Sequence, residues 1–197
     1  AGDILVRLDE TQTKAADSIV TKNLDELIAQ QARLEAERDG EDHVDFPATL
    51  TALAHDTNSN AARTMIAEQK LFALRREARE GKKAQLRERI AQLRELIQSY
   101  VAQTAAKGRE IELINKELEG VRELWKVKLT PLSRLIALER DAARIEGEQS
   151  QLIGSVAETK GKITETELQI IQVDQDLRSE VGKDLAETRA KVSEFVE

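Results

Sequence analysis

Two histidines and three aspartates in one short segment are the residues of this sequence that could bind a metal or exchange protons. His43 and His55 share residues 40–58 with Asp42, Asp45 and Asp56. A metal site needs such side chains to converge, and their spacing matches no ligand pattern of zinc sites. We therefore interpret them as solvent-exposed loop residues and predict no metal site.

The remaining composition argues against an enzyme. Asp and Glu total 37 residues, but nothing indicates a concave core that would shift their pKa values towards catalysis. The sequence contains no phosphate-binding glycine loop, no nucleophile constellation and no cysteine. The formal net charge of −7 argues against nucleic acid as a partner, because phosphate binding needs a cationic surface. No apolar run is long enough for this segment to span a membrane.

Charged residues make up 34% of the chain and aromatic residues 3%, which is typical of long, exposed helices. We expect helices over residues 11–39, 59–126 and 131–197, separated by a loop at 40–58 and a tip turn at 127–131. Gly40 is expected to cap the C-terminus of the first helix. Residues 1–10 have the alternating pattern of a short strand after a Gly-Asp turn.

Each predicted helix carries one apolar stripe with steps of four and three residues, the spacing of a coiled-coil seam. In the first helix the stripe is Val20, Leu24, Leu27, Gln31 and Leu34. In the second it is Leu86, Ile90, Leu93, Ile97, Tyr100, Thr104, Lys107, Ile111, Ile114, Leu118, Val121 and Trp125. In the third it is Leu138, Ala142, Ile145, Gln149, Leu152, Val156, Thr159, Ile163, Thr166, Ile170, Val173 and Leu177. A stutter then carries the third stripe through Val181 and Leu185 to Thr188, Val192 and Phe195.

The two long helices have nearly equal lengths, each about 100 Å at the rise of an α-helix. The short turn between them makes them antiparallel neighbours. We therefore predict a mainly α fold, a long antiparallel coiled-coil helical hairpin with an extra shorter helix near its base. The alternative, in which the first helix continues straight into the second, would make the outward arm much longer than the return arm.

The loop at 40–58 is long enough to retrace the first helix. Its apolar residues Val44, Phe46, Leu50 and Leu53 would be costly to expose, so we expect the loop to pack on a helix. A short helical turn near residues 47–54 fits the sequence after Pro47.

The turn at 127–131 brings apolar and hydroxyl groups together. Val127 and Leu129 have little core to fill at a two-helix tip, which indicates contact with a partner. Thr130 precedes Pro131, so its hydroxyl either caps the third helix or serves docking, and both roles compete for one oxygen. Trp125 is interpreted as the seam residue that closes the tip, with an interface anchor as the alternative.

Three phrases, in order and separated by long helices, resemble the HlyD/PrtE-type periplasmic adaptors, or membrane fusion proteins, of bacterial type I secretion systems. GDILVRLDETQTKA resembles the end of the first half of their lipoyl-like domain, FPATLTALAHD the loop after their first helix, and LTPLSRLIALERDAARIEG their hairpin tip. The resemblance covers nearly the whole chain. It makes residues 1–10 a partial lipoyl-like half-motif and residues 11–197 the helical hairpin. The lipoyl-like strand has no lysine for modification, so we expect no covalent cofactor.

The resemblance implies an adaptor in the periplasm, anchored to the inner membrane by segments outside this fragment. It would bridge an inner-membrane ABC transporter and a TolC-like outer-membrane channel for protein secretion, as a ring of copies of itself, expected to be a hexamer. The alternative is a generic structural coiled-coil tether or rod without a transport role. A third class, a lipoyl carrier of an enzyme complex, would need a complete barrel and an exposed lysine turn.

Adaptors of this kind often carry at the tip an Arg, a Leu four residues later, and a Ser or Thr seven residues after that. Here Arg122 is followed by Lys126 in the place of Leu, whereas Ser133 occupies the third place. The resemblance therefore carries over the tip region and not the motif itself. The partner-binding residues expected in that region are Arg122, Leu124, Val127, Leu129, Thr130, Ser133 and Arg134.

Overall fold

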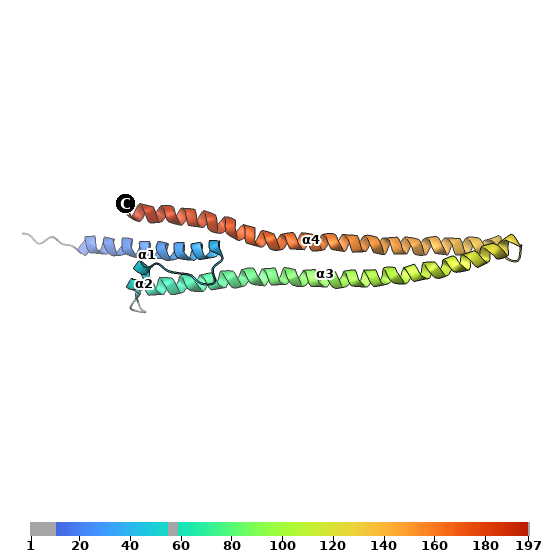
Figure 1. The fold of residues 1–197 in the computed structure, drawn as a ribbon. Helices are drawn as coiled ribbons and strands as arrows, with labels where there is room; N and C mark the ends of the chain where they lie inside the picture. Colours follow the sequence, from blue (N-terminus) through green and yellow to red (C-terminus); the bar gives the residue numbers. More distant parts are fainter. Residues whose placement is uncertain (1–10, 55–58, 197) are drawn as a thin grey trace, which may run out of the picture. The chain divides into compact units, whose positions relative to one another are not determined.

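The computed structural model describes residues 11–54 and 59–196 and contains four α-helices over these ranges (Figure 1). Helix α1 spans Thr11–Asp39, α2 Ala48–Leu53, α3 Asn60–Lys126 and α4 Leu132–Val196. The prediction of a mainly α helical hairpin with one additional shorter helix is confirmed. The strand predicted for residues 1–10 lies outside the described residues.

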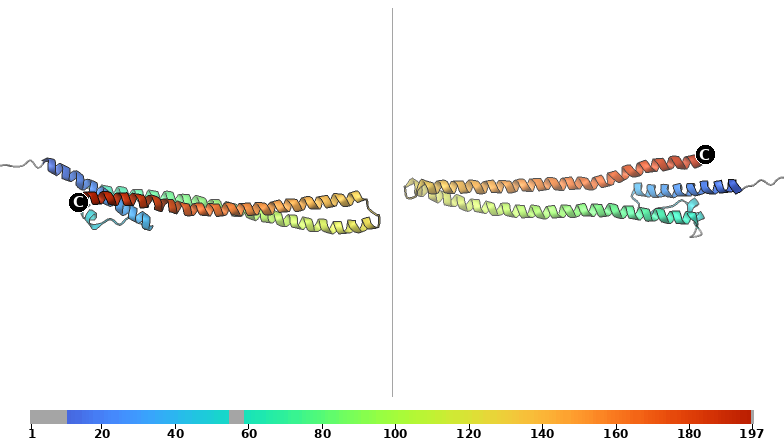
Figure 2. Two further views of the ribbon diagram at one scale, coloured as in Figure 1. Left: turned by 90° about the horizontal axis from the view of Figure 1, so that it is seen from above. Right: turned by 180° about the vertical axis from the view of Figure 1, so that it is seen from behind.

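The chain divides into two compact units, and α3 and α4 contribute to both. The three-helix unit comprises Ala1–Lys82 and Gln172–Glu197, and it contains α1, α2 and one end of each long helix. The two-helix unit comprises Lys83–Ile171, and it contains the rest of α3 and α4 with the turn that joins them (Figure 2).

Helix α1 is held in the three-helix unit by apolar contacts on several of its faces. Its residues enter one buried cluster with the following loop and α3, a second with α2 and α3, and a third with α4. The three clusters are Ala32, Ala36, Val44 and Phe72; Ala29, Leu50 and Ala61; and Leu34, Val181 and Leu185. Helix α1 therefore packs back on the long helices, as predicted, and does not continue into α3.

The loop after α1 packs much as the sequence suggests. Gly40 has φ +74°, and the N–H of Glu41 donates to the carbonyl of Ala36 at 3.0 Å, which is the Schellman arrangement of a helix C-cap. Phe46 packs against both clusters that join α1 to α3. The expectation that Leu53 also packs is wrong, because its side chain is 54% exposed. Helix α2 has only 6 residues, and it buries one of them, Leu50.

A chain of charged groups joins the three helices beside these clusters. The guanidinium of Arg33 on α1 is buried and bonds to Glu37 at 2.8 Å and to Glu68 of α3. Burial alone would lower the pKa of Arg33, but the bonds to Glu68 and Glu37 outweigh burial, so the pKa rises. Arg75 of α3 then lies 3.7 Å from Glu37 and bonds to Glu180 of α4. The charges therefore fix how α1 sits along α3 and α4.

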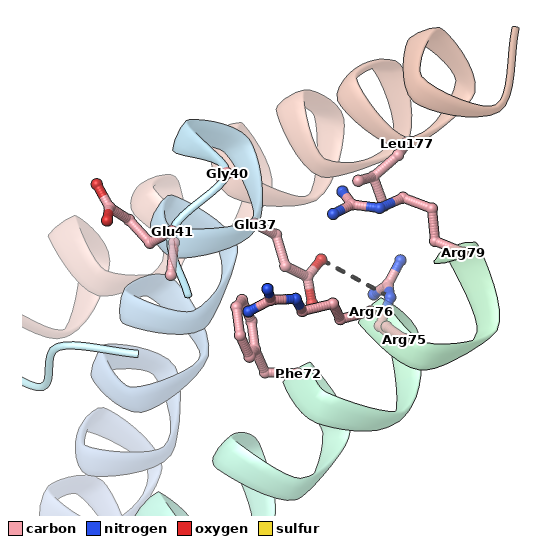
Figure 3. A pocket seen from close by; sticks show the side chains of 9 residues that line it. Glu37, Gly40, Glu41, Phe72, Arg75, Arg76, Arg79 and Leu177 are labelled. Atoms are coloured by element: carbon pink, nitrogen blue, oxygen red, sulfur yellow. Dashed lines mark ion pairs between the residues drawn. The ribbon is translucent and has the colours of Figure 1, made fainter. Parts of the chain in front are cut away.

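Figure 3 shows the narrow pocket around the Glu37–Arg75 ion pair. Arginines of α3 line one side of this pocket, and Leu177 of α4 lies opposite α1. Arg76 is turned to the loop, where it bonds to the Asp42 carboxylate at 2.6 Å and to its carbonyl at 3.0 Å. Ion pairs at this pocket therefore connect α3 to α1 and to the loop that follows α1.

Removing the buried guanidinium should loosen α1 selectively. Arg33→Met leaves the buried carboxylate of Glu37 without its nearest cation, so we expect a loss of about 3 kcal/mol in the local stability of α1. Hydrogen exchange of the α1 amides measures this loss. Arg38→Met is the matched control, because Arg38 pairs with Asp39 at the surface and should change stability very little. Equal protection of α1 in both variants would contradict the role given to the buried network.

In the two-helix unit, the predicted seam is the line along which α3 and α4 meet. Its positions from Leu86 to Val121 on α3 and from Leu138 to Ile170 on α4 are all buried or half-buried. Large apolar residues off the seam, such as Leu113 and Ile153, are more than half exposed. This unit therefore buries a single stripe on each helix and leaves the outer faces open to solvent.

The seam is interrupted halfway by a polar layer formed by Thr104, Lys107 and Gln149. The Gln149 amide donates to the Thr104 carbonyl at 3.3 Å, so one helix bonds directly to the backbone of the other. Lys107 turns outward to Glu148 at 2.7 Å and Glu110 at 3.0 Å, and both carboxylates raise the pKa of Lys107. A polar layer of this kind specifies helix register at some cost in stability.

Gly108 provides the space for that contact. A Cβ at position 108 would lie 3.1 Å from the Gln149 amide nitrogen, whereas a Cβ at Gly147 would meet nothing within 4 Å. The glycine therefore allows the close approach on which the Gln149–Thr104 bond depends.

These two glycines should respond differently to alanine. Gly147→Ala should stabilise the hairpin by about 1 kcal/mol through helix propensity alone. Gly108→Ala should give close to no gain, because displacing the Gln149 amide removes a hydrogen bond worth about 1 kcal/mol. Denaturant unfolding followed by circular dichroism compares them. Equal stabilisation by both substitutions would show that the polar layer contributes nothing.

Candidate functional site

The tip of the hairpin begins where the buried seam ends. The last apolar cluster of the two-helix unit consists of Leu118, Leu135, Leu138 and Ala142, with Ile114 and Val121 packed against it. Two exposed ion pairs cross between the helices at the same level, Arg134 with Glu117 at 2.6 Å and Arg122 with Glu139 at 2.9 Å. Each contributes only a few tenths of a kcal/mol, because both lie in solvent. They fix the ends of the two helices where the turn starts.

The turn itself is a Schellman C-cap on α3. The N–H of Leu129 donates to the carbonyl of Leu124, and that of Lys128 donates to the carbonyl of Trp125, both at 2.9 Å. Lys128 occupies the left-handed position with φ +59°. Gly40 occupies the same position in the cap of α1. A side chain at this φ costs about 1 kcal/mol relative to glycine.

The seven residues predicted for partner binding all lie at this tip. Leu124, Val127, Leu129, Ser133 and both arginines are exposed, and Leu129 is the most exposed large apolar residue of the described chain at 75%. The arginines are engaged in the cross-helix ion pairs and so contribute to the shape of the tip.

The predicted capping role of Thr130 is not observed. Helix α4 begins at Leu132, and the N–H of Arg134 donates to the carbonyl of Pro131 at 3.1 Å. Pro131 is thus the residue before the helix and not its first residue, which places Thr130 one position too early to cap. Among the residues that the structure describes, no hydrogen bond uses the Thr130 hydroxyl. Thr130 is half-buried as a residue, and its hydroxyl has no partner among the described residues that would compete with docking.

The interpretation of Trp125 as the seam residue that closes the tip is wrong, and two further exposed apolar residues, Leu132 and Ile136, were not recognised from the sequence. Trp125 does not close the seam, because its side chain is 43% exposed and the last seam contacts on α3 are those of Val121. Helix α4, which would have to cover the indole, starts only at Leu132. Leu132 and Ile136 are also about half exposed. The position of the predicted turn could have indicated this exposure, because a seam residue within one helical turn of a hairpin bend has no residue of the other helix opposite it.

The tip differs in charge from the rest of the chain. Residues 122–134 contain four basic residues and one acidic residue, a net charge of +3 in a chain of −7. Exposed apolar side chains on a locally cationic surface characterise an interaction site and not a reaction centre. Over the described residues no group of three or more His, Cys, Asp or Glu is arranged to hold a metal. In the same ranges, no helix has an apolar stretch of the length needed to cross a bilayer.

Comparison with known proteins places this architecture in context. Residues 13–197 match the family described as AprE, long alpha-helical hairpin. The chain is 38% identical over 197 residues to the type I secretion system membrane fusion protein PrsE of Rhizobium meliloti (strain 1021), covering 100% of this chain and 44% of PrsE. It is 29% identical over 191 residues to the alkaline protease secretion protein AprE of Pseudomonas aeruginosa, covering 96% and 43%. The chain thus spans less than half the length of these curated relatives.

A solved structure shows the same fold. The crystal structure of the soluble domain of LipC, a membrane fusion protein of a type I secretion system, superposes with a TM-score of 0.88 at 22% identity, covering 98% of this chain and 90% of that one. These matches confirm the resemblance to type I secretion adaptors drawn from the sequence. The relatives are named as membrane fusion and secretion proteins, which agrees with the prediction that the chain is not an enzyme.

The exposure of Trp125 can be checked directly, because the sequence contains a single tryptophan. We expect the emission maximum of the folded protein to lie close to that of the urea-unfolded protein, with efficient quenching by acrylamide. The physical reason is that the indole at the tip remains in contact with water. A blue-shifted emission that is protected from acrylamide would instead return Trp125 to the buried seam.

Proposed function

The chain belongs to the AprE long α-helical hairpin family, and from this membership we propose that it is the hairpin of a periplasmic adaptor for type I protein secretion. In this proposal the adaptor bridges an inner-membrane ABC transporter and a TolC-like outer-membrane channel. It resides in the periplasm and is anchored to the inner membrane by parts of the protein outside this chain. The names of the relatives PrsE and AprE, a membrane fusion protein and a secretion protein, support this role.

The observation that carries the docking proposal is the concentration of exposed apolar side chains at the tip. These side chains are Leu124, Trp125, Val127, Leu129, Leu132 and Ile136. All six lie within 13 consecutive residues, where the two-helix unit has no core left to bury them. Leaving them in water is costly unless a partner covers them, so the tip is the surface best suited to bind the outer-membrane channel.

We further propose that copies of the protein assemble side by side in a ring, expected to be a hexamer. Within the two-helix unit, the outer faces of α3 and α4 expose single large apolar residues between charges, among them Leu96, Leu113, Ile153 and Leu168. Neighbouring copies would bury these residues, and the alternating charges would set their register. The adaptor then acts by geometry, as a conduit that seals and positions the channel, and it needs no chemical step.

A generic coiled-coil tether without a transport role remains the alternative function. It shares the seam, but it requires no apolar cluster at an exposed bend. The tip residues therefore distinguish the two functions.

A charge placed on the apolar tip should stop secretion without harming the fold. In the full-length protein, Leu129→Asp and Thr130→Asp should each reduce export to the level of a strain lacking the adaptor, because a carboxylate would have to be desolvated in the docked state. Helix content and melting temperature should remain unchanged. The measurement is the amount of secreted protein in the culture medium.

Ser179→Asp is the matched control for this experiment. It places the same charge on an exposed hydroxyl residue of α4 in the three-helix unit, away from the tip and from the proposed contacts between copies, and export should persist. Normal export from both tip variants would refute docking through the tip.

A further inference from the structure

Two helix caps of the same design use different residues at their left-handed position. In the cap of α1 this residue is Gly40, and in the cap of α3 it is Lys128. Both caps contain the same hydrogen bond from the residue after the left-handed one back to the helix, Glu41 to Ala36 and Leu129 to Leu124. The backbone of the tip therefore requires a left-handed conformation at position 128, which glycine adopts without strain and lysine adopts only with strain.

The side chain of Lys128 makes no polar contact that would stabilise the fold of the described residues. It is exposed, and among the described residues no hydrogen bond or ion pair uses its ammonium group. Backbone strain that is kept without a structural benefit is characteristic of functional positions. The side chain is then expected to act on something outside the chain.

Lys128 differs from the other basic residues of the tip in having no carboxylate partner in the part of the chain that the structure describes. The other three cations of residues 122–134 are each engaged by a carboxylate, Arg122 by Glu139, Lys126 by Glu123 and Arg134 by Glu117. Within the described tip, Lys128 is thus the one cation whose charge is not compensated. It sits at the bend between Val127 and Leu129, the two most exposed apolar residues of the turn.

We propose that Lys128 is the charged contact of the docking tip and that its ammonium group pairs with a carboxylate on the outer-membrane partner. This inference rests on the proposed function. The apolar side chains beside Lys128 would shield this ion pair from water. The pair would then favour one orientation of the tip on its partner. The partner surface is accordingly an apolar socket that holds an aspartate or glutamate side chain at its centre.

An anionic lipid surface is the competing occupant of a cationic, apolar tip. Binding to such a surface relies on clusters of four or more basic residues whose charges act together. The tip contains four basic residues, but Arg122, Lys126 and Arg134 are each paired with a carboxylate. The one uncompensated ammonium that is left in the described tip fits a single carboxylate better than a lipid surface.

The test uses the full-length protein with Lys128→Gly, Lys128→Glu and Lys128→Arg. Glycine keeps the left-handed backbone and removes only the side chain, so melting should be unchanged or slightly higher. Export should nevertheless fall by about tenfold or more, the effect of losing one shielded charged hydrogen bond. Glutamate should lower export further, and arginine should restore it. Lys70→Ala tests the loss of an exposed lysine of α3 that lies in the three-helix unit, and export should persist.

A zero-length carbodiimide cross-link in cells identifies the partner group directly. We expect mass spectrometry to find an amide between Lys128 and an Asp or Glu of an outer-membrane protein. Lys128→Arg should abolish this cross-link while export continues, because a guanidinium does not form the amide.

The outcomes separate this inference from the proposed function. If Leu129→Asp stops export and Lys128→Gly does not, the role of Lys128 is refuted and tip docking stands. If neither variant impairs export, tip docking itself is refuted. If the cross-link is absent and Lys128→Gly abolishes sedimentation with phosphatidylglycerol vesicles, the contact is a lipid surface and the carboxylate partner is refuted.

Discussion

Two helices that touch along one line have no interior beyond that line, and this constraint governs the two-helix unit. The seam residues of α3 are covered mainly by the seam of α4, so the apolar stripe is narrow and most other side chains are exposed to solvent. Some polar groups on the seam are satisfied within their own helix. Thr159 and Thr166 donate to the carbonyls of Ser155 and Lys162, four residues earlier in the same helix. The exposed outer faces and the tip are therefore the surfaces of this unit that a partner can contact.

The three-helix unit meets the same constraint by adding α1. The third helix creates a small core around Leu34, and it also encloses the guanidinium of Arg33 between carboxylates of α1 and α3. Apolar contacts between helices tolerate sliding by a turn, whereas a guanidinium that bonds to two carboxylates does not. The surface pair of Arg189 on α4 with Glu35 on α1 adds to this, and Gln31 and Arg189 together lower the pKa of Glu35. Ion pairs therefore specify the position of α1 along α3 and α4, which the apolar contacts alone would not specify.

The parts of the fold that follow from periodicity could be predicted from the sequence. The steps of four and three residues located the seam between α3 and α4, and Gly40 located the end of α1, because both depend on local geometry. The stripe predicted for α1 is only partly correct, because Val20 is 41% exposed and the helix buries Ala29, Ala32 and Ala36 on other faces. The incorrect predictions concern residues near the end of a helix, where the burial of side chains changes within one helical turn. Trp125 continues the seam pattern but has lost its opposite helix, and Leu53 ends a helix too short to bury it. At the tip, the partner-binding residues stay a prediction. Thr130 was expected to cap α4, but Pro131 is the residue directly before that helix. The left-handed conformation of Lys128 could not be predicted, because it produces no periodic pattern in the sequence.

We propose that this hairpin binds an outer-membrane partner end-on, through residues 122–134. A photo-activatable amino acid, placed in the full-length protein at single positions along α3 and α4, tests it most directly. End-on docking predicts adducts with one outer-membrane protein from exposed positions of the tip, such as Val127 and Leu132, and none from outer-face positions such as Leu113. Adducts with that protein from Leu113 and Ile153, and none from the tip, would contradict end-on docking.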